Sequence, residues 1–481
     1  MIRKVILMVF ICWMNPVSSQ TILLHPANPH YFEYKGKPAV LITSGMHYGA
    51  VLNLDINYDR YLNILDNYGF NLHREFIIPC YEWLTGDNWM SEQTPLSPRP
   101  GKLLSPYARS TIPGAIDGLN KFDLDQWNPV YFNHLRDFCR KADEKGIVIE
   151  IVLFTVLYSE GAWETNPLNS KNNVNGIGNG HYNEYTFIRE PLLLEKQRQL
   201  VRKTVMELND FDNVYFEICN EPYWAKGIPE VNPEIKEQHF LPEVNTWQAV
   251  MAETIIETEK NLPKKHLIAQ NLANVYYKID TLCHPSVSVL NYHYAFPPQV
   301  VPDNYHFNLP LSFDETANGC NAPDRRTEAW AFMLSGGAVY DNLDWSFAID
   351  DQSGRGRNPA GRRRSGLEVK QQLGILKHLL DSFDFIHSKP IEMGKISNMP
   401  EKVLFCGLEN KEGLVIYFLK RNVSEIHQAL LNILPGKYEL TWIDPIDGSI
   451  IRKKPILIQE NALLLEFPEF SDDLLLTLQR I

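Results

Sequence analysis

The feature that most constrains this chain is the alternation, across residues 38–385, of short apolar runs with longer amphipathic stretches. Near-continuous apolar character is what strands buried on both faces require. Eight such runs occur, at residues 39–43, 70–77, 147–154, 214–219, 266–270, 287–293, 309–314 and 338–345. Helically spaced apolar residues fill many of the intervals, at residues 128–145, 192–208, 247–262, 325–334 and 366–385. Strands that alternate with helices predict an α/β fold, a closed (β/α)8 TIM barrel.

Long turn-rich segments follow three of the predicted strands, at residues 82–123, 158–190 and 350–365. Long loops usually carry function, and loops at the carboxyl ends of barrel strands build the active site. The third segment holds a basic cluster from Arg355 to Arg364, for which a solvated loop is the plainer interpretation. The connections after Gln270 and Tyr294 carry little helical signal, so we expect those two crossovers to be reduced.

The pattern changes after residue 391. Seven short strand-like runs follow, at residues 403–406, 413–419, 429–434, 438–442, 450–453, 462–467 and 474–478, with Pro-Gly and Asp-Gly turns between some of them. Such runs indicate an antiparallel β-sandwich. We therefore divide the chain into a signal peptide (1–19), a barrel (20–390) and a β-sandwich accessory domain (391–481). The sandwich could bind glycan or brace the barrel, and bracing is the simpler expectation.

The N-terminus is typical of a cleaved signal peptide. Arg3 and Lys4 precede an apolar run over residues 5–14, and Val17-Ser18-Ser19 supplies small residues for cleavage. The run is too short to span a membrane, so we expect a secreted or periplasmic protein. Cys12 lacks the small-residue context of a lipoprotein site, which makes a surface lipoprotein the less favoured interpretation. The net charge of −12 argues against nucleic acid as a partner, because like charges repel.

Several reaction classes lack their sequence signatures. Neither HExxH nor another tight ligand cluster occurs, so we predict no metal and no cofactor. A serine hydrolase is disfavoured because no GxSxG elbow is present. The cysteines of the predicted mature chain form no CxxC pair and no dense disulfide framework; they are Cys80, Cys139, Cys219, Cys283, Cys320 and Cys406.

Two apolar runs end in carboxylates. Residues 214–219 lead into Asn220-Glu221-Pro222, and residues 309–313 lead into Asp314-Glu315. Charged groups are rarely buried unless they are paired or used. Cleavage of a glycosidic bond needs a proton donor, and a partly desolvated glutamate can supply it. In a barrel, the fourth and seventh strands lie across a narrow mouth from one another.

Side chains alternate along a strand, so we expect only one of Asp314 and Glu315 to face the mouth, and we favour Glu315. A carboxyl separation of roughly 5 Å would give double displacement, whereas about 6.5–9.5 Å would leave room for water and give inversion.

These segments resemble clan A of the glycoside hydrolases, the retaining β-acting barrel enzymes, and in particular cellulase- and mannanase-like enzymes of the family 5 type. The resemblance covers residues 30–385 and identifies the clan better than a family. In that clan the acid/base glutamate follows an asparagine at the end of strand four, and the nucleophile ends strand seven. The resemblance implies that Glu221 is the acid/base, that Glu315 is the nucleophile, and that Asn220 contacts the sugar.

Further substrate-binding residues follow from the same resemblance. Arg74, in Phe70-Asn71-Leu72-His73-Arg74, matches the arginine that supports the nucleophile. His293 and Tyr294 are similar to a His and Tyr of strand six, although here they are adjacent rather than separated by one residue. Trp345 ends strand eight, where an aromatic platform is expected.

Two more residues are candidates by position. His47 ends the first predicted strand, where substrate contact and a structural hydrogen bond are both open. Trp163 lies in the second long loop, and it could contact sugar or be an ordinary core aromatic.

We therefore predict a secreted retaining glycoside hydrolase that acts on a carbohydrate substrate. The alternatives are a non-catalytic glycan-binding barrel and a transglycosylase on the same fold. The sugar, the linkage, endo or exo action and the oligomeric state stay open at this level.

Overall fold

The computed structural model describes residues 21–46, 48–78, 95–96, 98–224, 242–316, 322–356, 366–421 and 426–481. The predicted signal peptide, His47 and most of the basic cluster up to Arg364 lie outside these residues.

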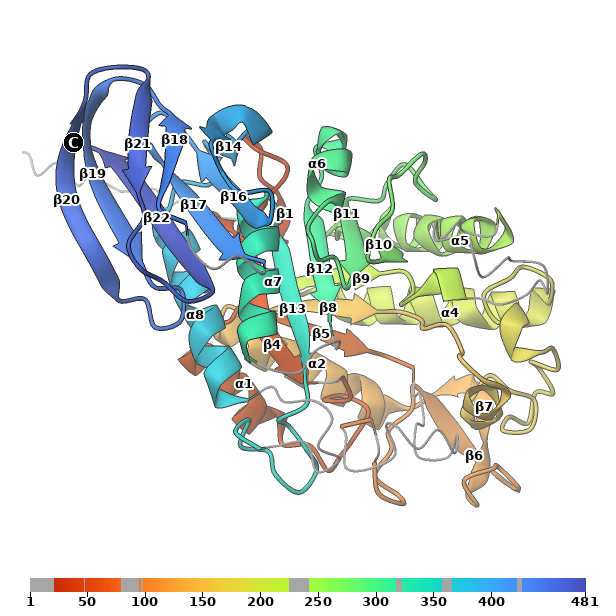
Figure 1. Cartoon of the computed structure of the whole chain (residues 1–481). Coiled ribbons are helices and arrows are strands. Elements are labelled where there is room, and N and C mark those ends of the chain that lie inside the picture. The colour runs from red at the N-terminus through yellow and green to blue at the C-terminus, as the bar shows by residue number, and fades with distance from the viewer. Residues whose placement is uncertain are drawn as a thin grey trace, which may run out of the picture.

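Eight parallel strands form the barrel (Figure 1). They are β4 (Leu41–Met46), β5 (Leu72–Phe76), β8 (Val148–Val152), β9 (Val214–Glu217), β10 (Ile268–Asn274), β11 (Val289–His293), β12 (Leu311–Glu315) and β13 (Val339–Asp344). Their order is β4-β13-β12-β11-β10-β9-β8-β5. Asn71 closes the gap between β5 and β4, because its backbone N–H donates to Ile42 O (3.2 Å) and its side chain accepts from Ile42 N (3.0 Å). Each strand overlaps a predicted apolar run, so the predicted barrel is confirmed.

Helices cover the outside of the barrel (Figure 1). They are α1 (Tyr58–Asn67), α2 (Pro129–Glu144), α4 (Pro191–Leu208), α5 (Pro242–Glu259), α7 (Ala322–Leu334) and α8 (Leu367–Ser382). Local sequence explains where two of them start. The side chains of Asn57 and Asn128 cap α1 and α2, and Pro129 occupies the first turn of α2. The two weak crossovers are reduced as expected, since β10 and β11 have no helix between them and β11 is followed by the short α6 (Val300–Asn304) and η4 (Tyr305–Phe307).

The predicted long loops contain elements that their sequences did not indicate. The first includes the hairpin of β6 (Tyr107–Pro113) and β7 (Asn120–Trp127). The second holds α3 (Glu160–Thr165) and η2 (Tyr182–Glu184). A small antiparallel sheet precedes the barrel, made of β1 (Leu23–Leu24), β2 (Phe32–Tyr34) and β3 (Lys37–Ala39).

The C-terminal strands form two antiparallel sheets, which confirms the predicted sandwich. The larger has the order β14 (Lys389–Pro390), β16 (Val403–Glu409), β17 (Gly413–Lys420), β22 (Asp473–Arg480), β19 (Gly436–Ile443) and β20 (Ile450–Ile458). The smaller has the order β15 (Ile396–Ser397), β18 (Gln428–Asn432) and β21 (Ala462–Glu466). Among the helices of the described ranges, none has the length and apolar character of a membrane span.

A buried ion pair joins the sandwich to the barrel. Arg326 of α7 donates through Nε and Nη2 to Asp473 of β22, at 2.8 and 2.9 Å. Tyr417 donates to the same carboxylate at 2.8 Å, and Gln372 of α8 accepts from Arg326 at 3.1 Å. The Trp330 ring stacks on Tyr417 with the centroids 5.9 Å apart. This packing favours a bracing role for the sandwich.

The first prediction tests that interface. Arg326→Met leaves Asp473 buried without its counter-charge, so the free energy of unfolding should fall by about 3–5 kcal/mol. Urea denaturation followed by tryptophan fluorescence measures it. The matched control is Lys453→Met, which removes a half-exposed pair with Glu439 and should cost less than about 1 kcal/mol. A loss of that small size in Arg326→Met would contradict the interface as described.

Candidate active site

Glu221 follows β9 at the carboxyl end of the barrel. Its φ of 50° lies in the left-handed region, which non-glycine residues adopt mainly where the surrounding structure demands it. The backbone N–H of Glu221 donates to Asn271 Oδ1 of β10 at 3.2 Å, which ties the turn to the next strand. This conformation directs the carboxylate towards the barrel mouth.

The Glu221 carboxylate is in contact with His293, Tyr158 and Tyr223. His293 Nδ1 lies 3.1 Å from Oε1, and Tyr158 donates its hydroxyl to Oε2 at 2.5 Å. The Tyr223 hydroxyl lies 3.5 Å from Oε1. Neither tyrosine was among the predicted site residues. Both lie in segments that follow barrel strands, and that position was the available signal.

Glu315 ends β12 on the opposite side of the mouth. Arg74 Nη1 and the Tyr48 hydroxyl both donate to its Oε2, at 3.0 and 2.5 Å, and the Tyr294 hydroxyl donates to Oε1 at 3.3 Å. Neighbouring residues of a strand normally point to opposite faces, yet His293 and Tyr294 both reach this site. They can do so because β11 ends at His293 and Tyr294 has a φ of 52°.

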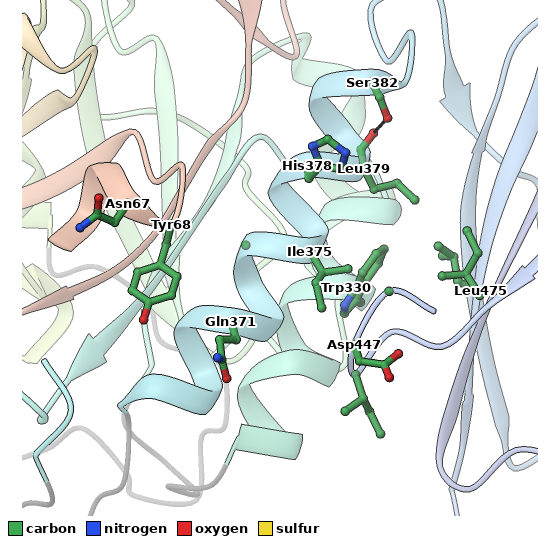
Figure 2. Close-up of a pocket in the computed structure, with 14 residues that line it drawn as sticks. Asn67, Tyr68, Trp330, Gln371, Ile375, His378, Leu379, Ser382, Asp447 and Leu475 are labelled. Atoms are coloured by element: carbon green, nitrogen blue, oxygen red, sulfur yellow. Dashed lines mark hydrogen bonds between the residues drawn. The ribbon is translucent and has the colours of Figure 1, made fainter. Parts of the chain in front are cut away.

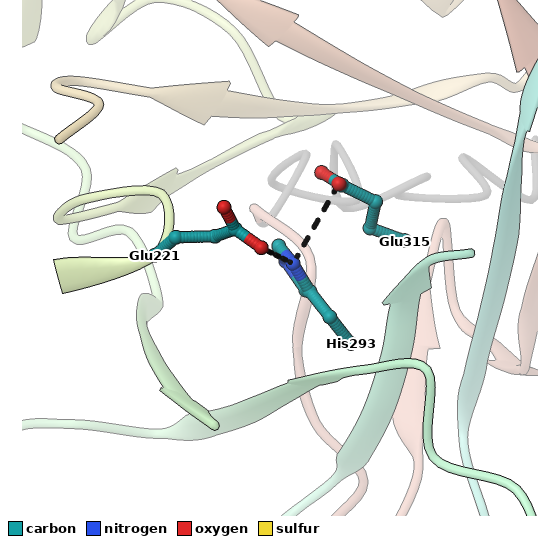
Figure 3. A group of neighbouring side chains, drawn as sticks. All are labelled: Glu221, His293 and Glu315. Carbon is teal, nitrogen blue, oxygen red and sulfur yellow. Dashed lines mark hydrogen bonds and ion pairs between the residues drawn. The ribbon is translucent and has the colours of Figure 1, made fainter. Parts of the chain in front are cut away.

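The two glutamates face one another across His293 (Figure 3). One carboxylate oxygen of Glu221, one of Glu315 and a ring nitrogen of His293 all lie within 4.8 Å of one another. His293 Nδ1 is 3.1 Å from Glu221 Oε1 and 3.8 Å from Glu315 Oε1. Burial disfavours the imidazolium, but Glu315, Asp314 and the hydrogen bond to Glu221 outweigh it and raise the pKa of His293 to about 9. At neutral pH a cation therefore lies between the carboxylates.

Arg74 of β5 connects the site to the barrel interior. Its guanidinium is fully buried and binds Glu217 through two hydrogen bonds of 2.7 and 2.8 Å. It also donates to Asn220 Oδ1 at 2.8 Å and lies 3.1 Å from Asp314 Oδ2, in addition to its contact with Glu315. The structure thus brings the predicted Arg74, Asn220 and Glu315 together.

Asp314 and Glu315 do not alternate as in a regular strand, although Glu315, and not Asp314, lies with Glu221 at the mouth as expected. Tyr292 pairs with Phe313, but His293 pairs with Glu315, so Asp314 is an extra residue in β12. Such a bulge re-aims side chains. Both carboxylates consequently reach the same guanidinium, with Asp314 fully buried and Glu315 still 7% exposed.

A second acidic layer lies inside the barrel. Glu150, Glu217 and Asp314 are fully buried, and Asn291 donates to Glu150 at 2.6 Å and to Asp314 at 3.0 Å. Burial, reinforced by the Asp314 charge, raises the pKa of Glu150 well above its usual range, and burial raises that of Asp314 to about 7. A raised pKa favours the neutral form of each carboxyl, so burial acts to reduce the negative charge beneath Arg74.

The other predicted substrate contacts have different outcomes. Trp345 follows β13 directly and is 7% exposed. Trp163 is 1% exposed and donates its indole N–H to Gly180 O at 2.8 Å, so it packs inside its own loop as a core aromatic. His47 lies outside the described residues.

In the described part of the chain, two groups of side chains have the spacing to hold a metal ion: Glu221, His293 and Glu315, and also Glu150, Glu217 and Asp314. In the second group, both oxygens of Glu217 already accept from Arg74.

A separate groove of about 870 Å³ lies at the junction with the sandwich (Figure 2). Tyr68, Trp330, Ile375, His378 and Asp447 are among the residues that line it, and none of the predicted site residues is. It is therefore distinct from the two-glutamate site.

Solved structures similar to this protein align with almost the whole chain. A protein from Bacteroides vulgatus ATCC 8482, provisionally assigned as a glycoside hydrolase, matches with a TM-score of 0.64 and 14% identity over 96% of this chain and 83% of its own. A family 5 glycoside hydrolase from the same organism matches with a TM-score of 0.60 and 10% identity over 96% and 93%. The chain has a clan A glycoside hydrolase-like fold. At these identities the likeness concerns the fold.

Comparisons of sequence assign no function to the chain. A family model described as a domain of unknown function, DUF6298, matches residues 103–220. The comparison with curated proteins found no match.

The second prediction concerns His293. Its folded pKa of about 9 exceeds the unfolded value of about 6.5, so the protonated ring stabilises the fold fully below about pH 6.5, and this stabilisation is lost as the pH rises through about 9. The difference in unfolding free energy between the wild type and His293→Gln should therefore shrink between pH 6 and pH 10. Urea denaturation at a series of pH values measures it, with the exposed His378→Gln as control. A difference that grows with pH would refute the protonated ring.

Proposed function

We propose that this protein is a secreted glycoside hydrolase that cleaves β-linked glycosides or polysaccharides with retention of anomeric configuration. Glu315 is the nucleophile and Glu221 is the general acid/base. The separation of at most 4.8 Å between carboxylate oxygens of these residues carries the proposal. This closest approach of two oxygens fits the roughly 5 Å between the carboxyl groups of retaining enzymes better than the roughly 6.5–9.5 Å of inverting ones. The clan A-like fold supports the same reaction class.

The contacts suggest how the two steps proceed. A Glu315 oxygen attacks the anomeric carbon while the glycosidic oxygen leaves with a proton from Glu221. Water then attacks the same carbon and gives a proton to Glu221, and the bonding electrons return to the Glu315 carboxylate. Arg74 stabilises that carboxylate, and Asn220 and Trp345 supply contacts for the sugar.

The proposal of secretion rests on the predicted signal peptide, residues 1–19. Deletion of this segment should retain the protein inside the producing cell, as cell fractionation would show.

The third prediction tests the nucleophile. Glu315→Ala removes the attacking group but keeps the cleft, so turnover on a panel of β-glycans should fall on the order of 10⁴-fold or more. Glycan binding should persist in isothermal titration calorimetry. Glu412→Ala, an exposed strand-turn position in the sandwich, is the control and should keep wild-type rates.

Other results of that experiment would identify the alternatives. Equal inactivity of wild type and variant, with glycan binding retained, would indicate a binding protein. Products longer than the substrate at high acceptor concentration would indicate a transglycosylase. Product NMR showing inverted configuration would contradict double displacement.

The fourth prediction tests the acid/base. In Glu221→Gln the leaving group no longer receives a proton, so hydrolysis of unactivated glycosides should slow by about 10²–10⁴-fold. Aryl glycosides with good leaving groups need little protonation and should retain much more of their first-step rate. Pre-steady-state kinetics on both substrate types measures the contrast. Uniform loss on both would show that Glu221 acts structurally.

A further inference from the structure

Tyr48 is one of the residues at this site that the reaction scheme does not use. It follows β4, the first barrel strand, and its ring is only 3% exposed. Its φ of 49° is unusual for a bulky side chain, and such strain persists only where the surroundings hold it. The next residue, Gly49, has a φ of 90°, and a Cβ there would lie 2.5 Å from Pro95 O. The backbone is thus closely fitted around Tyr48.

The Tyr48 hydroxyl is directed by contacts with Phe76, Arg74 and Glu315. The ring stacks on Phe76 with the centroids 3.8 Å apart and an interplanar angle of 14°. Arg74 Nη1 donates to the hydroxyl oxygen, and the hydroxyl donates to Glu315 Oε2 at 2.5 Å. Burial, opposed by Arg74 but reinforced by Glu315, raises the pKa of Tyr48 well above its usual range. The hydroxyl therefore keeps its proton and acts as a donor to the carboxylate.

The two oxygens of Glu315 have different surroundings. Oε2 accepts from both Arg74 and Tyr48. Oε1 accepts from Tyr294 at 3.3 Å and lies 3.8 Å from His293 Nδ1, which is also 3.1 Å from Glu221 Oε1. The anomeric carbon must lie between the two glutamates, and Oε1 is the oxygen on that side.

We propose that Tyr48 is a positioning residue that, with Arg74, holds Glu315 Oε2 and presents Oε1 to the anomeric carbon. This inference rests on the proposed function. A donor to a carboxylate stabilises its charged form. Glu315 is neutralised as an ester in the intermediate and regains its charge when water releases the sugar. The Tyr48 hydroxyl therefore assists the second step more than the first.

The fifth prediction uses Tyr48→Phe, which keeps the ring stacked on Phe76 and removes only the hydroxyl. With an activated aryl glycoside, kcat should fall on the order of 10- to 100-fold, the range for losing a hydrogen bond to a charged group. KM should fall with it because the glycosyl-enzyme accumulates, visible as a kinetic burst and as added mass on Glu315. The acidic limb of kcat/KM should move to higher pH because Glu315 loses a donor.

Two Tyr-to-Phe controls locate the effect. Tyr158→Phe removes the donor to Glu221 instead, so it should move the basic limb and leave the acidic limb in place. Tyr34→Phe removes a hydroxyl that binds Asp143 away from the site and should leave kcat, KM and both limbs unchanged. If Tyr48→Phe does not fold, Phe76→Leu removes the stacked ring and should give a smaller change of the same kind.

The outcomes are separable from those of the proposed function. Wild-type kcat, KM and acidic limb in folded Tyr48→Phe would overturn the inference, as would a loss in kcat/KM without intermediate accumulation or a shifted limb. A wild type without glycosidase activity would contradict the proposed function alone. In that case the unfolding free energy still tests the contact: the difference between wild type and Tyr48→Phe should be present at neutral pH and shrink as acid protonates the carboxylate that accepts the hydrogen bond. A pH-independent difference would overturn it.

Discussion

The candidate site depends on one buried guanidinium. Arg74 contacts Glu217, Asp314, Glu315 and Asn220, which belong to or directly follow two different barrel strands. A buried charge without partners would be costly, so the arginine and the carboxylates require each other. Because its planar fork fixes the directions of its hydrogen bonds, Arg74 sets the distance and the orientation of the groups at the mouth. The chemistry proposed for the glutamates needs that geometry before substrate binds.

The carboxylates crowded in the barrel interior shift the pKa values of their neighbours and of one another. Glu150 and Asp314 have raised pKa values because they are buried near other carboxylates, while His293 has a raised pKa because it lies among them. The barrel interior thus places a cation between the two glutamates and reduces the charge beneath them. Tyrosine hydroxyls complete the arrangement, with Tyr48 on Glu315 and Tyr158 on Glu221.

Backbone irregularities place several of these groups. The bulge at Asp314 turns two consecutive carboxylates towards one arginine. Left-handed conformations at Tyr48, Glu221 and Tyr294 direct their side chains into the same space. Regular strands could not do this, because neighbouring side chains would alternate. The strands hold the site rigidly, and the bulge and the left-handed residues at their carboxyl ends place its side chains.

Sequence alone predicted the architecture, because apolar runs buried on both faces have a distinctive pattern. It also showed that Asn220-Glu221 and Glu315 stand where such runs end, and the resemblance to clan A supplied the roles expected of the two glutamates. Sequence could not separate Trp163, packed in its own loop, from a sugar platform, because both are aromatic residues in a loop. Nor could it choose Tyr48, Tyr158 and Glu217, since their importance arises from partners 26 to 267 residues away. Only the closed barrel brings those partners within hydrogen-bonding distance, and only its local bulges and left-handed turns decide which atoms meet.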